Sequence, residues 1–450
     1  MPGEREVEPR LTDLETSLVT IPVPEQSEVA PSIGQEMQAV LIIGAAVNEE
    51  VMDLLKRVDP MPQVQTYRFH WAAIHAIEKA GGSLVDIIST VPTFDYPVTR
   101  KVLWGLRRVQ SREAEGRQFV IMPFVNLLGL KQVTRFVSCF WFTLSWLWSH
   151  RRHPRKVLLL YGLIVSHLYV ALILGKLFGT KVVTIVTDPP TPRRTDENAI
   201  YAAARSVDRW LLLWGLKRID GLIALAEGTS RLVARGVPAI VVEGMISDEV
   251  EQFCRSLAPA ENRGESVGRF VIMYAGQMDE RLYGVEILLD AFKQLEDPSF
   301  ALWLFGRGRL VEEVRRAAEG DSRIVYWGFH EADVVLSHMQ EASVLVNSRP
   351  VDEAYGRFSF PSKVLEYLAM GKIVLSSRLP GIPVDYHPHL VFVDEMTPSN
   401  LATRLREIAG WSLEKRREAG NQARDFAWRN KTQLHQGERI CRFLRDVVEG

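Results

Sequence analysis

The sequence is poor in cysteine and nearly balanced in charge. Its 450 residues include only three cysteines, Cys139, Cys254 and Cys441, and the formal net charge is −1. Three distant cysteines form neither a metal-ligand spacing nor a disulfide framework, which favours a reducing, cytoplasmic location. The charge balance provides no case for nucleic acid as a partner.

The sequence also lacks an apolar signal segment near its start. Residues 1–36 are rich in Glu, Pro, Ser and Thr and contain no hydrophobic h-region. We expect a disordered leader there. The remaining chain is long enough for two or three domains, and its 47% hydrophobic content is that of an ordinary globular protein.

Strands and helices are predicted to alternate along the chain. The apolar run Val40–Ile43 is followed by the small-residue turn Gly44–Ala45 and by a helix near 49–58. A second strand–helix–strand unit covers 157–186, a pattern typical of a parallel sheet. The polar stretch 258–268 predicts a linker, after which another buried strand begins at Phe270. The fold class is therefore α/β, with a parallel sheet and a second domain after the linker.

The segment Ser359–Lys372 is the most informative. Ser359 is a suitable N-cap and Pro361 suits a first turn, and an apolar stripe and a terminal glycine follow. Lys363 would lie in the first turn, where the helix dipole disfavours a cation unless an anion is bound. Glu366 lies on the same face and could accept hydrogen bonds from a ribose. The alternative is an ordinary surface helix with an exposed Lys and Glu.

That segment, SFPSKVLEYLAMGK followed by IVLSSRLPGIP, resembles the donor site of family 4 retaining glycosyltransferases, which have the GT-B fold. The pieces VTIVTDPP, VVEGMI, FVIMYAGQMDERLYGVEILLDAF, LWLFGRGRL, IVYWGF and NSRP match one subgroup in order. The resemblance is dense from Ile219 to Glu407 and weaker from Val40 to Gly162. It implies an acceptor-side domain over 37–257, a linker over 258–268, a nucleotide-sugar domain over 269–425, and a terminal helix over 426–450 that crosses back.

The resemblance also implies site residues. The turn at Gly44 and Ala45 would face the acceptor, although it could be a plain strand–turn–helix connection. Backbone groups at Gly328 and Phe329 would bind the base. The donor-binding set would comprise Gly276, Arg281, Gly328, Phe329, Arg349, Ser359, Phe360, Pro361, Ser362, Lys363 and Glu366.

Three positions depart from the family pattern. Gln277 and Tyr283 stand where many members have an Arg and a Lys that clamp the diphosphate, and Phe358 stands where the first of two glutamates falls. The neutralising charge would then come from Lys363 first, with Arg281 and Arg349 as weaker candidates. Arg281 could equally be a solvent-exposed side chain.

Two catalytic residues are expected, Lys363 and Asp188. Asp188 follows the strand 181–186, at the edge where open α/β sheets bind ligands, and in the family the matching segment faces the donor sugar. A turn-forming Asp before Pro189 is the alternative. His167, on an apolar helix, is better explained as a packed core histidine.

The segment Arg100–Lys156 contains twelve basic residues and only two acidic ones. Within it, 136–148 is a nearly apolar run with six aromatic residues, too short to span a bilayer. Aromatic residues beside the basic cluster 151–156 suit peripheral contact with an anionic membrane through 136–156. A buried helix with exposed basic flanks is the alternative.

The expected activity is metal-independent transfer of a sugar, with retention, from a nucleoside-diphosphate donor to a saccharide, lipid-linked or small-molecule acceptor. No cofactor or metal is expected, since no Asp-x-Asp or His/Cys cluster is present. Two other classes remain open: an inactive nucleotide-sugar-binding subunit, and a nucleotide-sugar epimerase, for which the cleft-facing segments contain few acid–base groups.

Overall fold

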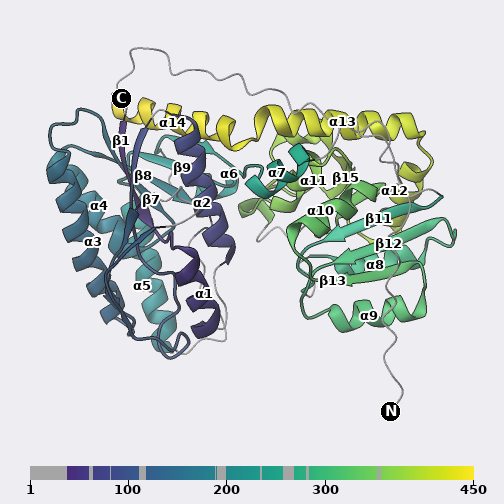
Figure 1. The fold of residues 1–450 in the computed structure, drawn as a ribbon, viewed down its shortest axis with the longest axis horizontal. Coiled ribbons are helices and arrows are strands. Elements are labelled where there is room, and N and C mark those ends of the chain that lie inside the picture. The colour runs from purple at the N-terminus through teal and green to yellow at the C-terminus, as the bar shows by residue number, and fades with distance from the viewer. Residues whose placement is uncertain are drawn as a thin grey trace.

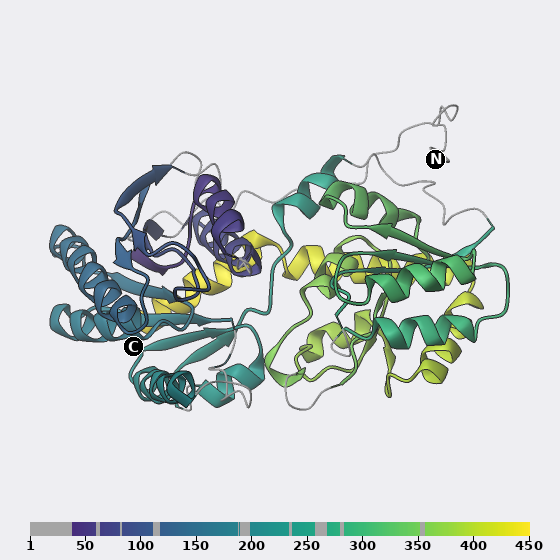
Figure 2. The same ribbon diagram turned by 90° about the horizontal axis from the view of Figure 1, so that it is seen from below.

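The computed structural model describes residues 38–59, 64–81, 83–110, 118–187, 189, 199–233, 236–256, 268–279, 283–351 and 356–450. They form two α/β bodies joined by a long helical segment, which extends along both in Figures 1 and 2. In the described part of the chain, every helix is too short or too polar to cross a membrane.

The first body contains an eight-stranded sheet in the order β10-β9-β8-β7-β1-β2-β5-β4. All its pairs are parallel except β4 with β5. A small antiparallel pair, β3 with β6, lies beside it. The strands are β1 (Gln38–Gly44), β2 (Ser83–Ser89), β3 (Leu103–Trp104), β4 (Arg107–Gln110), β5 (Gln118–Ile121), β6 (Phe124–Val125), β7 (Lys156–Tyr161), β8 (Lys181–Val186), β9 (Gly221–Ala224) and β10 (Ala239–Val241).

Helices cover both faces of this sheet, as continuous apolar strands require. Along β7, Leu159 and Tyr161 enter the core on one face, whereas Leu158 and Leu160 enter the core on the other. The helices of this body are α1 (Glu49–Val58), α2 (Val64–Lys79), α3 (Leu130–Ser149), α4 (Val165–Phe178), α5 (Ala199–Leu216) and α6 (Glu227–Val233).

The second body contains a six-stranded, fully parallel sheet in the order β13-β12-β11-β14-β15-β16. Two apolar cores lie on its two faces. Its elements are α7 (Asp248–Ser256), β11 (Phe270–Ala275), α8 (Val285–Lys293), β12 (Phe300–Phe305), α9 (Val311–Gly320), β13 (Ile324–Gly328), α10 (Ala332–Glu341), β14 (Val344–Asn347), η1 (Gly356–Phe358), α11 (Ser362–Ala369), β15 (Ile373–Ser377), η2 (Val384–His389), β16 (Val391–Val393), α12 (Pro398–Ala409) and α13 (Leu413–Asn430).

The chain enters the second body before residue 258, where the predicted linker begins. Helix α7 contacts α10, and its Val250 and Cys254 lie in a core of the second body. The predicted acceptor-side domain therefore extends too far, because helical periodicity at 248–256 does not reveal which core the helix joins.

The chain returns between α13 and α14 (Gln433–Glu449). Thr432 caps α14 by accepting a hydrogen bond from the His435 N–H. Helix α13 packs against α11 and β15 of the second body, whereas α14 packs against α2 and the first sheet. The crossing thus lies at Lys431–Thr432, rather than at 426.

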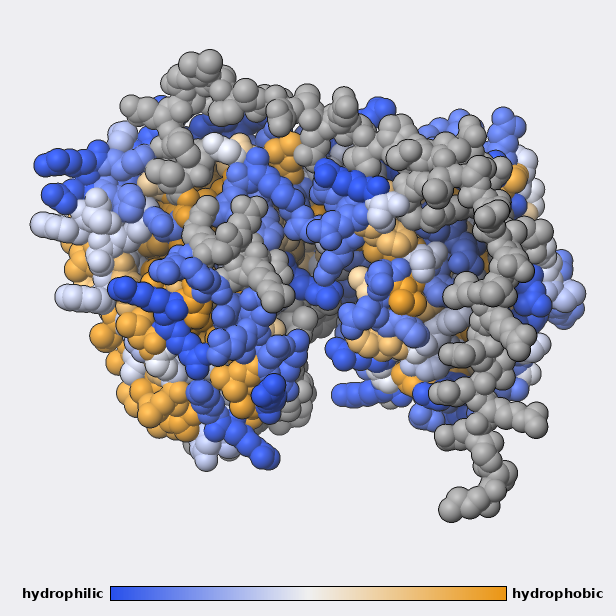
Figure 3. Space-filling model, viewed as in Figure 1, coloured by the Kyte–Doolittle hydropathy of each residue, from blue (hydrophilic) through white to orange (hydrophobic). Residues whose placement is uncertain are grey.

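The residues of 136–148 divide between a buried and an exposed side of α3. Trp146 is buried, and Phe136, Phe140 and Phe142 are partly buried against the core. Trp141 and Trp148 are 69% and 63% exposed. Figure 3 shows hydrophobic residues gathered on the outer side of the first body, in the region of α3 and α5.

Candidate functional site

Helix α11 begins later than the sequence predicts. Its first residue is Ser362, and Pro361 occupies the N-cap position with extended backbone and no side-chain cap. Ser359 is therefore not the N-cap. Its carbonyl lies only 2.3 Å from where a Cβ on Gly381 would stand, so the backbone of Ser359 packs against the 379–382 turn instead of entering the helix. Gly371, with φ +71°, follows the last turn as predicted.

Lys363 lies in the first turn of α11, and its ammonium forms no direct ion pair among the described residues, although the Glu366 charge acts on it from one turn away. Its Nζ is a buried atom without a hydrogen-bond partner in that part of the chain. It lies 3.9 Å from the centre of the Tyr274 ring. Burial, and then the nearby Arg349 charge, lower the pKa of Lys363 to about 7. An anion bound here would supply the missing charge and hydrogen bonds.

Gly276, directly after β11, makes room for this ammonium. A Cβ on Gly276 would stand 3.2 Å from Lys363 Nζ, and its φ of +151° disfavours other residues. Gly306, after β12, is packed still more closely, since its Cβ would lie 1.8 Å from the Gly276 carbonyl oxygen. The two loops at the carboxyl edge of the sheet therefore contact each other backbone to backbone, beside Lys363.

Glu366 lies one turn further along α11 and is partly exposed. Burial, and then the charge of Glu249, raise its pKa to about 7, against opposing effects of Arg68 and Lys363. Arg68 belongs to α2 of the first body and Glu249 to α7, and the two form a surface ion pair at 3.8 Å. The Glu366 carboxylate thus lies near the place where the two bodies meet.

Two tyrosine hydroxyls contact Gln277 in the loop after β11, where Gln277 and Tyr283 replace the basic pair of the family pattern. The Tyr274 hydroxyl donates a 2.6 Å hydrogen bond to the Gln277 carbonyl, and the Tyr283 hydroxyl lies 3.4 Å from Gln277 Oε1. Arg281 lies outside the described residues. Arg349 follows β14 and is close enough to lower the pKa of Lys363, so the structure brings these two predicted basic residues together.

Gly328 is the last residue of β13, at the same edge of the sheet, and Phe329 follows it. Gly328 has φ +87°, and the Phe329 ring is 61% exposed, with the Arg307 guanidinium 4.6 Å from its centre. Three predicted donor-binding residues lie at the start of α11. Phe360 and Pro361 are buried, whereas Ser362 is exposed.

Three predicted site residues belong to the first body. Gly44 is the last residue of β1 and Ala45 follows it, and both are buried, whereas Asp188 lies outside the described residues. His167 is buried in the core, as predicted, with its pKa lowered to about 3 by burial.

His70 was not singled out by sequence reasoning, although it lies directly against the Gly44 turn. Its ring stacks on Tyr161 at 3.7 Å, and its Cε1 lies 2.3 Å from the position of a Cβ on Gly44. Both ring nitrogens are buried and have no partner among the described residues, and burial lowers the pKa of His70 to about 3. A histidine within an apolar helical pattern carries no sequence signal that separates this position from an ordinary core histidine.

The two bodies also touch just before α11. The Thr229 hydroxyl of α6 donates a 3.2 Å hydrogen bond to the Phe358 carbonyl. A Cβ on Gly228 would stand 2.3 Å from the Arg357 carbonyl oxygen. The segment leading into α11 is therefore held directly by the first body.

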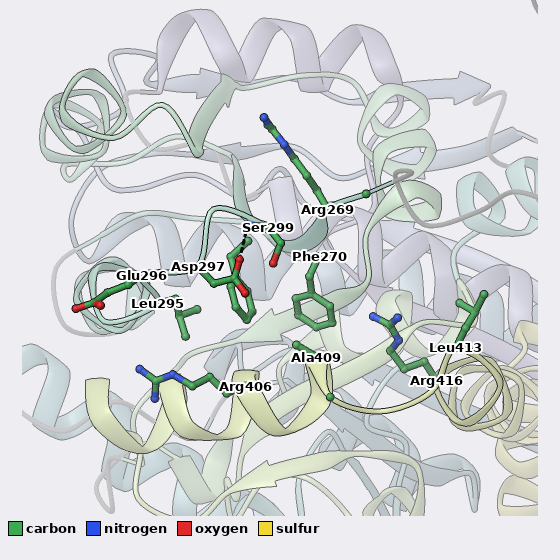
Figure 4. A pocket seen from close by; sticks show the side chains of 13 residues that line it. Arg269, Phe270, Leu295, Glu296, Asp297, Ser299, Arg406, Ala409, Leu413 and Arg416 are labelled. Carbon is green, nitrogen blue, oxygen red and sulfur yellow. Dashed lines mark hydrogen bonds between the residues drawn. The ribbon is translucent and has the colours of Figure 1, made fainter.

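A separate hollow of about 750 Å³ lies at the amino ends of β11 and β12 (Figure 4). Its lining includes Phe270, Asp297, Arg406 and Arg416. Parallel α/β sheets bind ligands at the carboxyl ends of their strands, so we assign the candidate site to α11 and not to this hollow. In the described part of the chain, no group of three or more His, Cys, Asp or Glu side chains is arranged to hold a metal.

Comparisons with known proteins address the fold and the family of the second body. Residues 269–410, which contain β11 to α12, match the family model described as "Glycosyl transferases group 1". No curated protein matches the sequence.

Solved structures match across most of the chain. A sucrose-phosphate synthase from Thermosynechococcus elongatus is 14% identical, with a TM-score of 0.55, and covers 91% of this chain and 98% of its own. The lipopolysaccharide outer core galactosyltransferase WaaB, in its apo form, is 14% identical with a TM-score of 0.56, covering 91% and 99%. HepE from Anabaena, in complex with UDP, is 13% identical with a TM-score of 0.55, covering 91% and 100%. The chain therefore has the GT-B fold, with two Rossmann-like bodies.

Proposed function

We propose that this protein is a retaining glycosyltransferase that uses a nucleoside-diphosphate sugar without a metal ion. The observation that carries the proposal is the buried, unpartnered ammonium of Lys363 at the start of α11, beside Gly276. The match of this body to group 1 glycosyltransferases supports it. The acceptor class is a saccharide, a lipid-linked molecule or a small molecule, and the protein would act in the cytoplasm, at the inner face of a membrane.

The role of Lys363 would be to stabilise the negative charge that develops on the leaving diphosphate. As the bond between the anomeric carbon and the diphosphate oxygen breaks, negative charge grows on the diphosphate. The Lys363 ammonium, the Arg349 guanidinium and the first N–H groups of α11 would stabilise that charge. The acceptor oxygen would bond to the anomeric carbon on the same face and pass its proton to the leaving phosphate. Asp188 would shape the sugar pocket.

The other predicted residues would hold the nucleoside. Glu366 would accept hydrogen bonds from the ribose hydroxyls, and backbone groups at Gly328 and Phe329 would contact the base. HepE has been solved with UDP and with UDP-glucose, which makes UDP the first nucleotide to test here.

A second candidate is a nucleotide-sugar-binding subunit without catalysis. It is favoured by Gln277, Tyr283 and Phe358, which replace charged residues of the family pattern. Binding of a nucleoside diphosphate without turnover on any acceptor would support this second candidate over the first.

The test is a thermal-shift screen of the full chain with UDP, GDP, ADP, CMP and dTDP, with EDTA present. A ligand that binds only the folded state raises the melting temperature. We expect a rise with one diphosphate that Lys363→Ala abolishes and that Lys293→Ala, on the exposed side of α8, retains. A shift that appears only with added Mg²⁺ would overturn metal independence, and an equal shift in the Lys363 variant would place the site elsewhere.

A further inference from the structure

Helix α3 exposes an apolar stripe along its whole length. Leu130, Val133, Val137, Trp141 and Trp148 follow one another at intervals of three, four, four and seven residues, so they share one side of the helix. The opposite side contains the buried residues, among them Cys139, Thr143 and Leu147. A helix that merely covers a sheet would carry polar residues on its outer side.

The neighbouring helices extend this face. Helix α4 lies between α3 and α5 and contacts both. Leu177 of α4 is 72% exposed and Trp210 of α5 is 63% exposed, and Ile173 and Val207 are exposed beside them. Several leucines near the start of α3 are exposed as well: Leu103, Leu106, Leu127 and Leu128. We call the exposed apolar residues of α3, α4 and α5 the tryptophan face.

Basic residues lie at the C-terminal ends of the three helices of the tryptophan face, and we call them the basic rim. The sequences of α3, α4 and α5 contain a single acid, Asp208. Arg151 lies 5.4 Å from the Trp148 ring centre, and Arg218 lies 3.3 Å from that of Trp214. Exposed basic residues are Arg151, Arg152, Lys176, Lys217 and Arg218.

We propose that the tryptophan face docks on an anionic phospholipid bilayer, with Trp141, Trp148 and Trp210 entering the headgroup region. Tryptophan favours the boundary between hydrocarbon and water, because its ring is apolar and its N–H is polar. The basic rim matches a negatively charged lipid surface. This surface differs from the segment 136–156 expected from sequence, because it excludes Trp146 and includes α4 and α5.

The position of α3 relates this surface to the cleft. Strand β5 is parallel to β2, and α3 follows it after the short strand β6. The apolar stripe therefore begins near the carboxyl edge of the first sheet, where the Gly44 turn lies, and extends away from it. A bilayer on this face would lie next to the acceptor side of the cleft.

The test is co-sedimentation of the full chain with vesicles of pure phosphatidylcholine and of an equal mixture of phosphatidylcholine and phosphatidylglycerol. We expect binding to the mixed vesicles that weakens as salt is raised. The double variant Trp141→Ala, Trp148→Ala should lose about tenfold or more in partitioning, since it removes two large apolar side chains from the bilayer contact. Trp327→Ala, which truncates a partly exposed tryptophan of the second body, is the matched control and should bind as the parent does.

The charge contribution is tested by Arg151→Gln, Arg152→Gln and Lys176→Gln combined. This triple variant should lose the preference for phosphatidylglycerol. A triple change of the same size in the second body, Lys293→Gln, Arg315→Gln and Arg316→Gln, should keep it. Circular dichroism and the nucleoside-diphosphate thermal shift verify folding and separate failure of this inference from failure of the donor site.

Three outcomes would overturn the inference. The parent could fail to bind either vesicle, or the tryptophan variants could bind equally well. Alternatively, sedimentation velocity without lipid could reveal a dimer that the Trp141 and Trp148 changes dissociate, which would make the face an interface between copies of this chain.

Discussion

Lys431 and Glu243 form a buried ion pair at the point where the chain passes between the two bodies. Lys431 Nζ lies 2.5 Å from Glu243 Oε1, and the two side chains are 5% and 2% exposed. The Tyr386 hydroxyl donates to the same carboxylate oxygen at 2.7 Å, and Lys431 also reaches Asp385 at 2.8 Å. Glu243 precedes α7, where the chain enters the second body, and Lys431 precedes α14, where the chain returns to the first body. The pair therefore links the two segments that connect the bodies.

Removing one partner of this pair should destabilise the fold. Glu243→Ala leaves the Lys431 ammonium buried with only the half-exposed Asp385 as counter-ion, a change that typically costs about 3–5 kcal/mol. The free energy of unfolding, measured by urea titration, checks this. The control is Glu227→Ala, which breaks the exposed pair with Arg231 and should change stability by about 1 kcal/mol or less. Equal effects would contradict the role assigned to the pair.

Nucleoside-diphosphate binding should depend on pH through Lys363. Burial lowers its pKa from 10.5 to about 7 in the free protein, so above pH 7 the free ammonium loses its proton. A bound diphosphate favours the protonated form, so binding takes up a proton and the affinity falls by up to about tenfold per pH unit above 7. Calorimetry in buffers of different ionisation enthalpy measures that uptake.

Lys363→Arg is the matched variant for this titration, because an arginine stays charged throughout the range. Its affinity should stay flat between pH 7 and 9. The same proton also links pH to the stability of the unliganded parent protein. Between pH 7 and 10.5, Lys363 is protonated in the unfolded state and mostly neutral in the folded state. The free energy of unfolding should therefore increase as the pH rises through that range. A parallel decline in affinity for both proteins would show that another group titrates.

Glu366 should distinguish ribose from deoxyribose. In the proposed complex its carboxylate would accept hydrogen bonds from the ribose hydroxyls, so Glu366→Ala should reduce the preference for the ribonucleoside diphosphate over its 2′-deoxy form by about 1–3 kcal/mol. Competition binding with the two nucleotides measures this. Glu312→Ala, on the exposed side of α9, should leave the preference intact.

The same preference should weaken in acid. Burial raises the pKa of Glu366 to about 7, so below that pH the side chain becomes protonated and loses an acceptor. The preference for the ribonucleoside diphosphate over its 2′-deoxy form is measured from pH 8 to pH 5.5, roughly the range over which such a group changes charge. If this preference stays constant, the ribose contact belongs to another residue.

Gly437 should be required for α14 to dock on the first body. A Cβ at Gly437 would stand 1.8 Å from the Ala76 carbonyl oxygen of α2, so Gly437→Ala forces the two helices apart and should cost about 1–3 kcal/mol. Gly320→Ala, also within a helix but with no atom nearby, should be neutral or stabilising by up to about 1 kcal/mol. Urea unfolding of both variants compares them, and matching midpoints would exclude close packing as the reason for Gly437.

The sequence by itself determined the local elements of this protein. Alternating apolar strands and amphipathic helices predicted two α/β units, because strand and helix periods depend only on neighbouring residues. A helix within Ser359–Lys372, with Lys363 and Glu366 on one face, followed from the same periodicity, and in the structure it covers Ser362–Ala369. The N-cap at Ser359 was wrong, since a capping residue type does not reveal that its backbone packs against Gly381.

The tertiary structure alone decided which of these residues share an environment. It buried Lys363 beside Tyr274 and Gly276, placed His70 against Gly44, and divided α3 into a buried side and an exposed tryptophan side. It also paired Glu243 with Lys431, which are 188 positions apart. Such contacts arise from how the two sheets and the crossing helices pack, and no short stretch of sequence encodes that packing.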